Sequence, residues 1–332
     1  MDPVEPIVVE PPPDPTEWSG QRIGESDVER LLSRTRELRA TDYRHGGGAC
    51  LDDLTTLVRN VQPMLAAFAT QVNKKRLFLA VADLHNLAGW VSFDVGDRGG
   101  AQVQFEQALV LAGEARDRRL TANILYRLGR VHLHHQEFDT ALEYLRVGAA
   151  AAAAAGPGAE LAASILSANQ AWTWASMGLD DEALRMLEHS QEQFTGADLA
   201  AAAGWEGFFT ANDLMAMAGT VHTELAYRVD PRHAQVAIPA LTDASTNYGT
   251  EMARSRTLSL VALSMSHLLD GDQDRGVDAG FQALALAENL TSVRVRDRMR
   301  PLAQSAQRHR THSGAQELAV RVTAFATSQD TT

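Results

Sequence analysis

The sequence is poor in cysteine and contains no long apolar run. Cys50 is the only cysteine among 332 residues, which excludes an intramolecular disulfide and any metal site built from several cysteines. No segment approaches the roughly 18 consecutive apolar residues of a membrane helix, and the acidic N-terminus lacks the basic start of a secretory signal. We therefore predict a cytoplasmic protein with no membrane partner, no metal site and no cofactor.

Positive charge is also in deficit, with 30 Lys and Arg against 42 Asp and Glu and a net charge of −12. This sign opposes unaided attraction to phosphate backbones. Alternate arginines form the one basic concentration, and they are a candidate contact with nucleic acid: Arg294, Arg296, Arg298 and Arg300. Their spacing distributes the charges around a helix and no aromatics are interleaved, so a solvated surface is the favoured interpretation.

Strand patterns are absent beyond the first residues, because apolar side chains recur at three- and four-residue spacing. We predict an all-α protein in three parts. Residues 1–20 hold six of the eleven prolines and read as an acidic tail or linker. Residues 21–78 form a helical segment, whose first helix starts at a capping box of Ser26 and Glu29, ends near Ala40 and precedes a glycine turn at 46–48. Residues 79–328 contain repeats.

The repeats follow a fixed spacing of small and bulky residues. A small residue is followed 7 positions later by a turn residue, 12 later by a small one, 16 later by a bulky one and 19 later by a small one. This series begins at Gly89, Gly129 and Ala171, and a fourth fit begins at Ser264 with Gly280 at the bulky position. Small residues where two helices cross, with a bulky one between them, are typical of helix hairpins. Between the third and fourth series we predict two irregular hairpins, near residues 208–228 and 233–248, and a last pair covers residues 301–325.

The hairpin pattern resembles the tetratricopeptide repeat, although its spacings of 40 and 42 residues exceed the usual ~34. The resemblance implies a right-handed superhelix whose first helices line a concave groove. The repeat register assigns to that groove the following residues: Asp83, Asn86, Trp90, Asp94, Asn123, Tyr126, Arg130, His134, Trp172 and Ser176. Asparagines can bind a peptide backbone, Arg130 a carboxylate, and the tryptophans apolar groups. Burial in the core is the alternative for each tryptophan.

A second resemblance lies in Ile23-Gly24, Asp27-Val28, Asp42, the glycines at 46–48 and the block GTVHTELA at 219–226. These features are similar to the region that follows the DNA-binding domain in actinobacterial helix-turn-helix (XRE-like) transcriptional regulators with C-terminal tetratricopeptide-like repeats. The likeness covers about residues 18–327. A helix-turn-helix of ~60 residues would precede this region, and a proline-rich tail stands in its place. We therefore expect DNA binding only through a domain that is not in this chain.

The resemblances imply a regulatory module that forms a homodimer and binds a peptide, a protein segment or a small-molecule effector in its groove. The alternative is a free-standing scaffold that holds a peptide segment of a partner and has no DNA target. We do not expect an enzyme, because the sequence has no GxGxxG, GxxxxGK[ST] or GxSxG motif.

Overall fold

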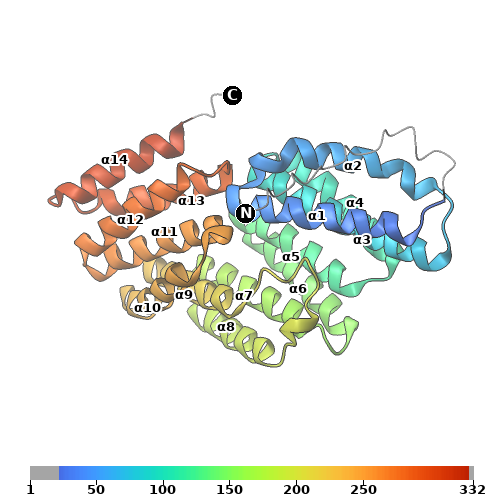
Figure 1. The fold of residues 1–332 in the computed structure, drawn as a ribbon. Coiled ribbons are helices and arrows are strands. Elements are labelled where there is room, and N and C mark those ends of the chain that lie inside the picture. Colours follow the sequence, from blue (N-terminus) through green and yellow to red (C-terminus); the bar gives the residue numbers. More distant parts are fainter. Residues whose placement is uncertain (1–21, 329–332) are drawn as a thin grey trace, which may run out of the picture.

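The computed structural model describes residues 22–328, and this part of the chain is all-helical, as predicted (Figure 1). An isolated bridge between Arg22 and Phe68 is its one extended pairing. The predicted tail at residues 1–20 lies outside the described residues. The α-helices are α1 (Glu25–His45), α2 (Leu51–Ala66), α3 (Gln71–Asp94), α4 (Arg98–Ala115), α5 (Arg118–His134), α6 (Phe138–Ala155), α7 (Glu160–Met177), α8 (Asp180–Thr195), α9 (Ala211–Arg228), α10 (Ala234–Asn247), α11 (Ala253–Asp270), α12 (Gln273–Ala287), α13 (Val293–Gln307) and α14 (Ser313–Thr327).

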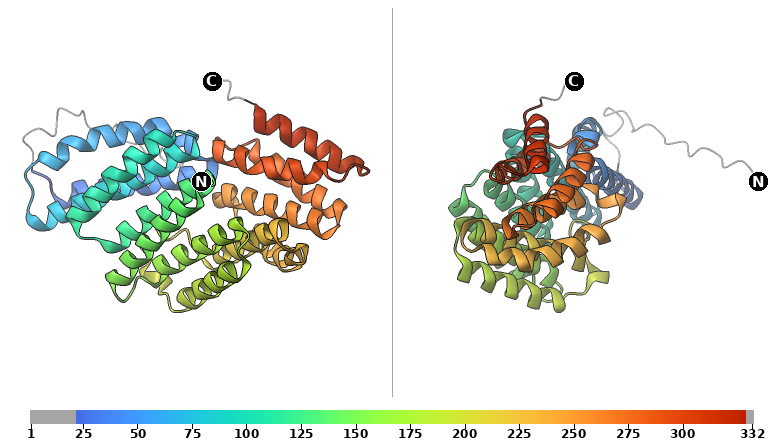
Figure 2. Two further views of the ribbon diagram at one scale, coloured as in Figure 1. Left: turned by 180° about the vertical axis from the view of Figure 1, so that it is seen from behind. Right: turned by 90° about the vertical axis from the view of Figure 1, so that its left-hand side faces the viewer.

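From α3 onward, consecutive helices pack in pairs: α3 with α4, α5 with α6, and so on to α13 with α14. The pairs follow one another along an arc (Figure 2). The first helix of a pair lies on the inside of the arc, since residues 80–94 of α3 and 259–268 of α11 are buried on all sides. The second helix keeps an exposed face, which carries Val103 and Val110 on α4.

Two local expectations differ from the structure. The first helix begins at Glu25 and ends at His45, and its cap is the Asp27 carboxylate, which accepts from the Gly24 backbone N–H at 2.7 Å. The predicted capping box of Ser26 and Glu29 is therefore wrong. The second difference lies at 208–248, where α9 and α10 form one pair and not two hairpins, because each predicted hairpin is a single helix.

Helix pairs occur at each of the four predicted series, and their geometry explains the spacing. A Cβ added to Gly89 would lie 2.7 Å from the Phe105 ring, and one added to Gly129 would lie 2.7 Å from Leu145 Cγ. Small residues are thus required where the two helices cross. The turn residue of each series has a left-handed backbone: Gly96, Gln136, Gly178 and Gly271 have φ of 88°, 61°, 78° and 91°.

Gln136 is the only non-glycine among these four turn residues, and a side chain in the left-handed region costs about 1 kcal/mol. We expect Gln136→Gly to raise the free energy of unfolding by about 0.5 kcal/mol, because the relief of this strain exceeds the entropy that glycine adds to the unfolded chain. Urea denaturation measures the change. Gly178→Ala is the matched control, and should lower stability by about 1 kcal/mol. A destabilising Gln136→Gly would contradict the turn geometry.

The two ends of the arc meet, because α1 contacts α11 and α3 contacts α13. Thr291, before α13, donates its backbone N–H to His45 O at 2.9 Å and accepts from Gly48 N at 3.0 Å. A Cβ on Gly46, which has φ of 88°, would lie 2.7 Å from Thr291 O. The predicted glycine turn therefore exists because a distant backbone approaches it closely.

Ion pairs complete this junction. Arg254 of α11 donates to both carboxylate oxygens of Asp42 in α1, at 2.5 and 2.8 Å. Arg294 of α13 donates to Asp94 of α3 at 2.9 Å, and Asp94 also lies 3.3 Å from Arg254. All four side chains are buried. We call this set of ion pairs, together with the Thr291 contacts, the clasp.

Candidate functional site

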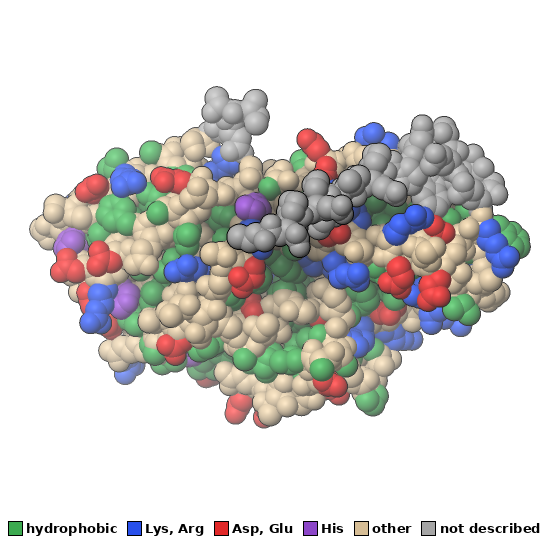
Figure 3. All heavy atoms as spheres, viewed as in Figure 1, with side chains coloured by type: hydrophobic (Ala, Val, Ile, Leu, Met, Phe, Trp, Pro, Cys, Tyr) green, Lys and Arg blue, Asp and Glu red, His purple; other side chains and the backbone are tan. Residues whose placement is uncertain are grey.

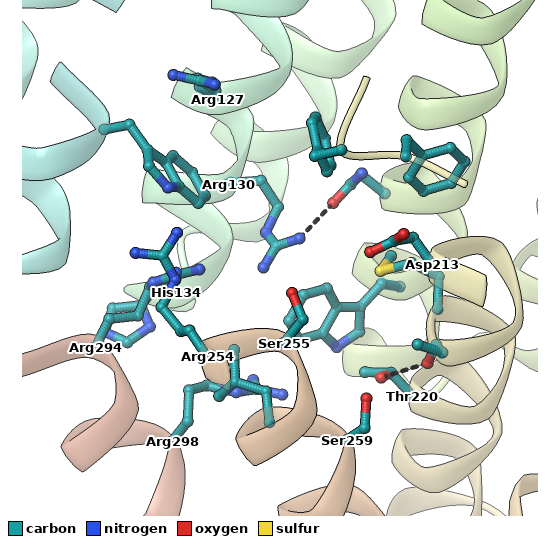
Figure 4. Close-up of a pocket in the computed structure, with 18 of the residues that line it drawn as sticks. Arg127, Arg130, His134, Asp213, Thr220, Arg254, Ser255, Ser259, Arg294 and Arg298 are labelled. Carbon is teal, nitrogen blue, oxygen red and sulfur yellow. Dashed lines mark hydrogen bonds between the residues drawn. The ribbon is translucent and has the colours of Figure 1, made fainter. Parts of the chain in front are cut away.

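A partly open cavity of about 150 Å³ lies between the inner helices at the centre of the arc (Figure 4). By the same measure a single water needs only about 10–15 Å³, so a small molecule fits. Side chains from α3, α5, α7, α9, α11 and α13 line it, with Tyr43 of α1 and the segment before α9. Eight Phe, Trp and Tyr side chains and five arginines dominate the lining: Tyr43, Trp90, Phe93, Tyr126, Trp172, Phe208, Phe209, Tyr248, Arg127, Arg130, Arg254, Arg294 and Arg298.

Four of these arginines lie over two tryptophan rings. The guanidinium carbons of Arg294 and Arg127 are 4.6 and 5.3 Å from the centroid of Trp90. Those of Arg130 and Arg298 are 4.4 and 4.5 Å from the centroid of Trp172. An aromatic face attracts a cation electrostatically, more strongly when both are desolvated. The tryptophans therefore hold positive charge inside the cavity.

Carboxylates balance only part of this charge. Arg254 and Arg294 are paired in the clasp, and Arg298 lies 3.9 Å from Glu224. Arg130 donates to the Asn169 side-chain oxygen at 3.0 Å, and Arg127 donates to the Asn86 carbonyl at 2.8 Å. Within residues 22–328 these last two arginines make no ion pair, so the cavity has an excess of positive charge.

The pKa values reflect the same imbalance. Burial, with repulsion from Arg294, Arg298 and Arg254, lowers the pKa of Arg130 to about 9. Burial likewise lowers the pKa of Arg298 despite the attraction of Glu224. In contrast, the attraction of Asp42 and Asp94 outweighs the effect of burial on Arg254, whose pKa is raised. The charged form of Arg130 is therefore unfavourable in free energy, and a nearby anion would stabilise it.

The far side of the cavity has a different character. Asp213 of α9 accepts from the Tyr248 hydroxyl at 2.8 Å and from the Thr210 hydroxyl at 2.7 Å, and burial raises its pKa. In Figure 4, Asp213 and Thr220 lie opposite the group formed by Arg254, Arg294, Arg298 and His134. The cavity is therefore polarised, with cations at one side and neutral or hydrogen-bonded polar groups at the other.

A segment between α8 and α9, residues 196–210, crosses the inner face near α5 (Figure 1). We call it the strap. Asn123 of α5 donates to the Trp205 carbonyl at 3.3 Å, Arg119 pairs with the buried Glu206 at 2.5 Å, and the Phe208 ring stacks on Tyr126 with centroids 6.1 Å apart. The strap thus occupies, within the same molecule, the surface that the sequence assigns to a peptide.

The predicted groove residues fall into two sets. Five of them line the cavity, as the repeat register places them: Trp90, Tyr126, Arg130, His134 and Trp172. The other five are buried away from it: Asp83, Asn86, Asp94, Asn123 and Ser176. For this second set the expected open groove is incorrect, because α1, α13 and the strap cover the inner face. Asp83 pairs with Arg39 at 2.5 Å, and Asn86 donates to Asn123 at 3.0 Å.

The arginine series of α13 does not form a basic surface. Arg294 and Arg296 are buried, and Arg296 donates to the Ser328 carbonyl at 2.9 Å. Arg298 lines the cavity, while Arg300 is exposed and pairs with Asp297 at 3.0 Å. The favoured solvated face is thus wrong for Arg294 and Arg296, because α13 packs against α3 and α11. On the face shown in Figure 3, acidic and basic side chains are interspersed.

Several cavity residues were not found from the sequence, among them Arg127, Asn169, Asp213, Arg254 and Phe208. The repeat register assigned no residue of the fourth series to the groove, so Arg254 was missed although it lies one helical turn before Leu258, which also lines the cavity. Asp213 and Phe208 lie where the repeat is irregular, and no spacing predicts them.

No family model matches the chain, and no curated protein matches it. Among solved structures, it is similar to the crystal structure of BtubC (BKLC) from P. vanneervenii, with a TM-score of 0.42 and 16% sequence identity, over 79% of this chain and 91% of that chain.

Within residues 22–328, no group of three or more His, Cys, Asp and Glu side chains is arranged to hold a metal ion. In the same residues, no helix is both long enough and apolar enough to cross a membrane.

Proposed function

We propose that this chain is the effector-binding module of a bacterial helix-turn-helix transcriptional regulator. In this proposal its helix pairs are tetratricopeptide-like repeats in a right-handed superhelix, and two copies form a homodimer. The resemblance of residues 18–327 to such regulators supports the assignment, and DNA is contacted by a separate helix-turn-helix domain.

One observation carries the regulatory part of the proposal: the cavity and the clasp share residues. Arg254 and Arg294 line the cavity and also join α11 and α13 to Asp42 and Asp94 at the other end of the arc. A ligand that contacts these arginines acts on the ion pairs that close the arc. It shifts the conformation if it binds the closed and open arcs with different affinities.

The cavity favours a small effector over a peptide. The strap already covers Asn123 and Tyr126, so a partner peptide could lie there only after displacing the buried Trp205 and the half-buried Phe208. A small molecule needs no such displacement. The scaffold alternative rests on the same observation, because Asn123 binds the strap backbone as it would bind a partner peptide.

Spin labels at the two ends of the arc test the proposal. Thr56→Cys on α2 and Val320→Cys on α14 place labels at exposed positions. Cys50 is buried, and burial raises its pKa to about 12, so it stays a thiol and is not labelled. We expect the low-molecular-weight fraction of the source bacterium to change the label-to-label distance distribution, and native mass spectrometry to show a bound small molecule. A bound molecule that leaves the distribution unchanged would contradict regulation through the clasp.

The link to transcription has its own test, which is the intact mass of the protein isolated from its own cells. We expect a product heavier than 36.0 kDa, with peptides of a helix-turn-helix before Ile23. A native product without such peptides, together with capture of a peptide that displaces the strap, would favour the scaffold.

A further inference from the structure

The cavity contains charge and hydrogen-bond donors that the protein itself does not satisfy. Of its five arginines, Arg127 and Arg130 have no carboxylate partner in residues 22–328, and the Arg298–Glu224 distance is 3.9 Å. The Trp172 indole N–H is buried without a hydrogen-bond acceptor, in a residue only 6% exposed. The Tyr43 hydroxyl, also in the lining, has no partner either. Buried cations and donors of this kind are costly unless a ligand pairs with them.

Part of the cavity lining is apolar. Tyr126, Phe208 and Phe209 line it with Leu133, Met217 and Leu258. The Tyr126 and Phe208 rings are stacked with an interplanar angle of 16°. A flat ring next to such surfaces gains both burial and favourable ring contacts. The lining therefore favours a ligand with an anionic group at one end and an aromatic ring next to that group.

We infer that the effector is a small aromatic acid, whose carboxylate or phosphate group lies between Arg130 and Arg298 and accepts from the Trp172 N–H, with its ring toward Tyr126 and Phe208. This inference rests on the proposed function and specifies the chemical class of its ligand. The acid supplies the anion that the two arginines over Trp172 lack. Its far end faces Asp213 and Thr220, which lie opposite the cations in Figure 4 and select for a polar substituent there.

The test uses three probes that share a naphthalene ring, namely 2-naphthoate, 2-naphthyl phosphate and the neutral 2-naphthamide, together with acetate, which lacks the ring. Isothermal titration at constant salt measures the dissociation constants. We expect at least one naphthyl acid to bind roughly tenfold or more tightly than 2-naphthamide, since a hydrogen bond to a charged group contributes about that factor. The preference between the two acids distinguishes a carboxylate effector from a phosphate effector, and acetate should bind more weakly than both.

Two variants test where the acid group of the ligand binds. Arg298→Gln removes a cation whose side chain is 30% exposed and whose one ion pair is long, so the fold should tolerate it, and we expect naphthyl-acid affinity to fall roughly tenfold. Trp172→Phe keeps a ring but removes the N–H, and should also weaken binding. Arg300→Gln is the matched control on the same helix, exposed and outside the cavity, and its affinity should stay within about twofold, as for a surface charge.

Three outcomes would overturn the inference: no binding of either naphthyl acid, equal binding of 2-naphthamide, or acid binding that Arg298→Gln leaves unchanged. A neutral effector found by native mass spectrometry, with a changed label distance, would overturn the aromatic-acid assignment and leave the proposed function intact. If a naphthyl acid binds as expected but leaves the label-to-label distance distribution unchanged, the aromatic-acid assignment is supported and the proposed regulation is contradicted.

Discussion

Replacing Arg254 with glutamine is expected to lower the free energy of unfolding by about 3–5 kcal/mol, the cost typical of removing one partner from a buried ion pair. Arg254 is 5% exposed and donates to both oxygens of Asp42. After the substitution Asp42 is buried without its cation, and Asp94 keeps Arg294 and the Gly47 backbone N–H as partners. The loss should separate the two ends of the arc, and urea denaturation followed by circular dichroism measures it.

An exposed arginine in the same protein provides the control. Arg34 pairs with Glu37 and Asp53 at 2.9 Å each, but its side chain is 42% exposed. Arg34→Gln should cost no more than about 1 kcal/mol, because water screens the pairs. In the clasp, Asp42→Asn added to Arg254→Gln should restore part of the lost stability, since no unpaired charge then remains at that position. A loss for Arg254→Gln as small as that for Arg34→Gln would contradict a closed clasp.

Truncation of Phe105 to alanine is expected to cost about 3–5 kcal/mol, as for other fully buried phenylalanines. Its ring is 0% exposed and fills the crossing of α3 and α4 at Gly89. Val103→Ala is the control on the same helix and should change stability little, because Val103 is 54% exposed. Thermal or urea denaturation reports both values.

The same crossing allows a double-mutant test. Gly89→Ala alone places a Cβ 2.7 Å from the Phe105 ring, and should cost about 1–3 kcal/mol through overpacking. In the Phe105→Ala background this penalty should disappear, because the ring is gone. Additive losses in the double variant would mean that the two residues do not meet, and the assigned crossing would be wrong.

Local spacing determined most of what the sequence could predict. Amphipathic periodicity and the near absence of strand patterns predicted an all-helical chain, which the described residues confirm. The recurring small and bulky positions predicted the pairs at Gly89 and Gly129, because two helices joined by a short turn meet at spacings that helix geometry dictates. The same register placed Trp90, Arg130 and Trp172 on inner helices, where they line the cavity.

Contacts between distant segments were decided only by the tertiary structure. Arg294 meets Asp94 across 200 residues, and Arg254 meets Asp42 across 212. Such pairs depend on how small rotations between successive helix pairs add up along the arc, and no single spacing records that sum. Closure of the arc therefore turned an expected open groove into a partly closed cavity, and it moved two arginines from an expected surface into the interior. The residue types came from the sequence, whereas arginines of α5, α11 and α13 surround one cavity only because the two ends of the fold meet.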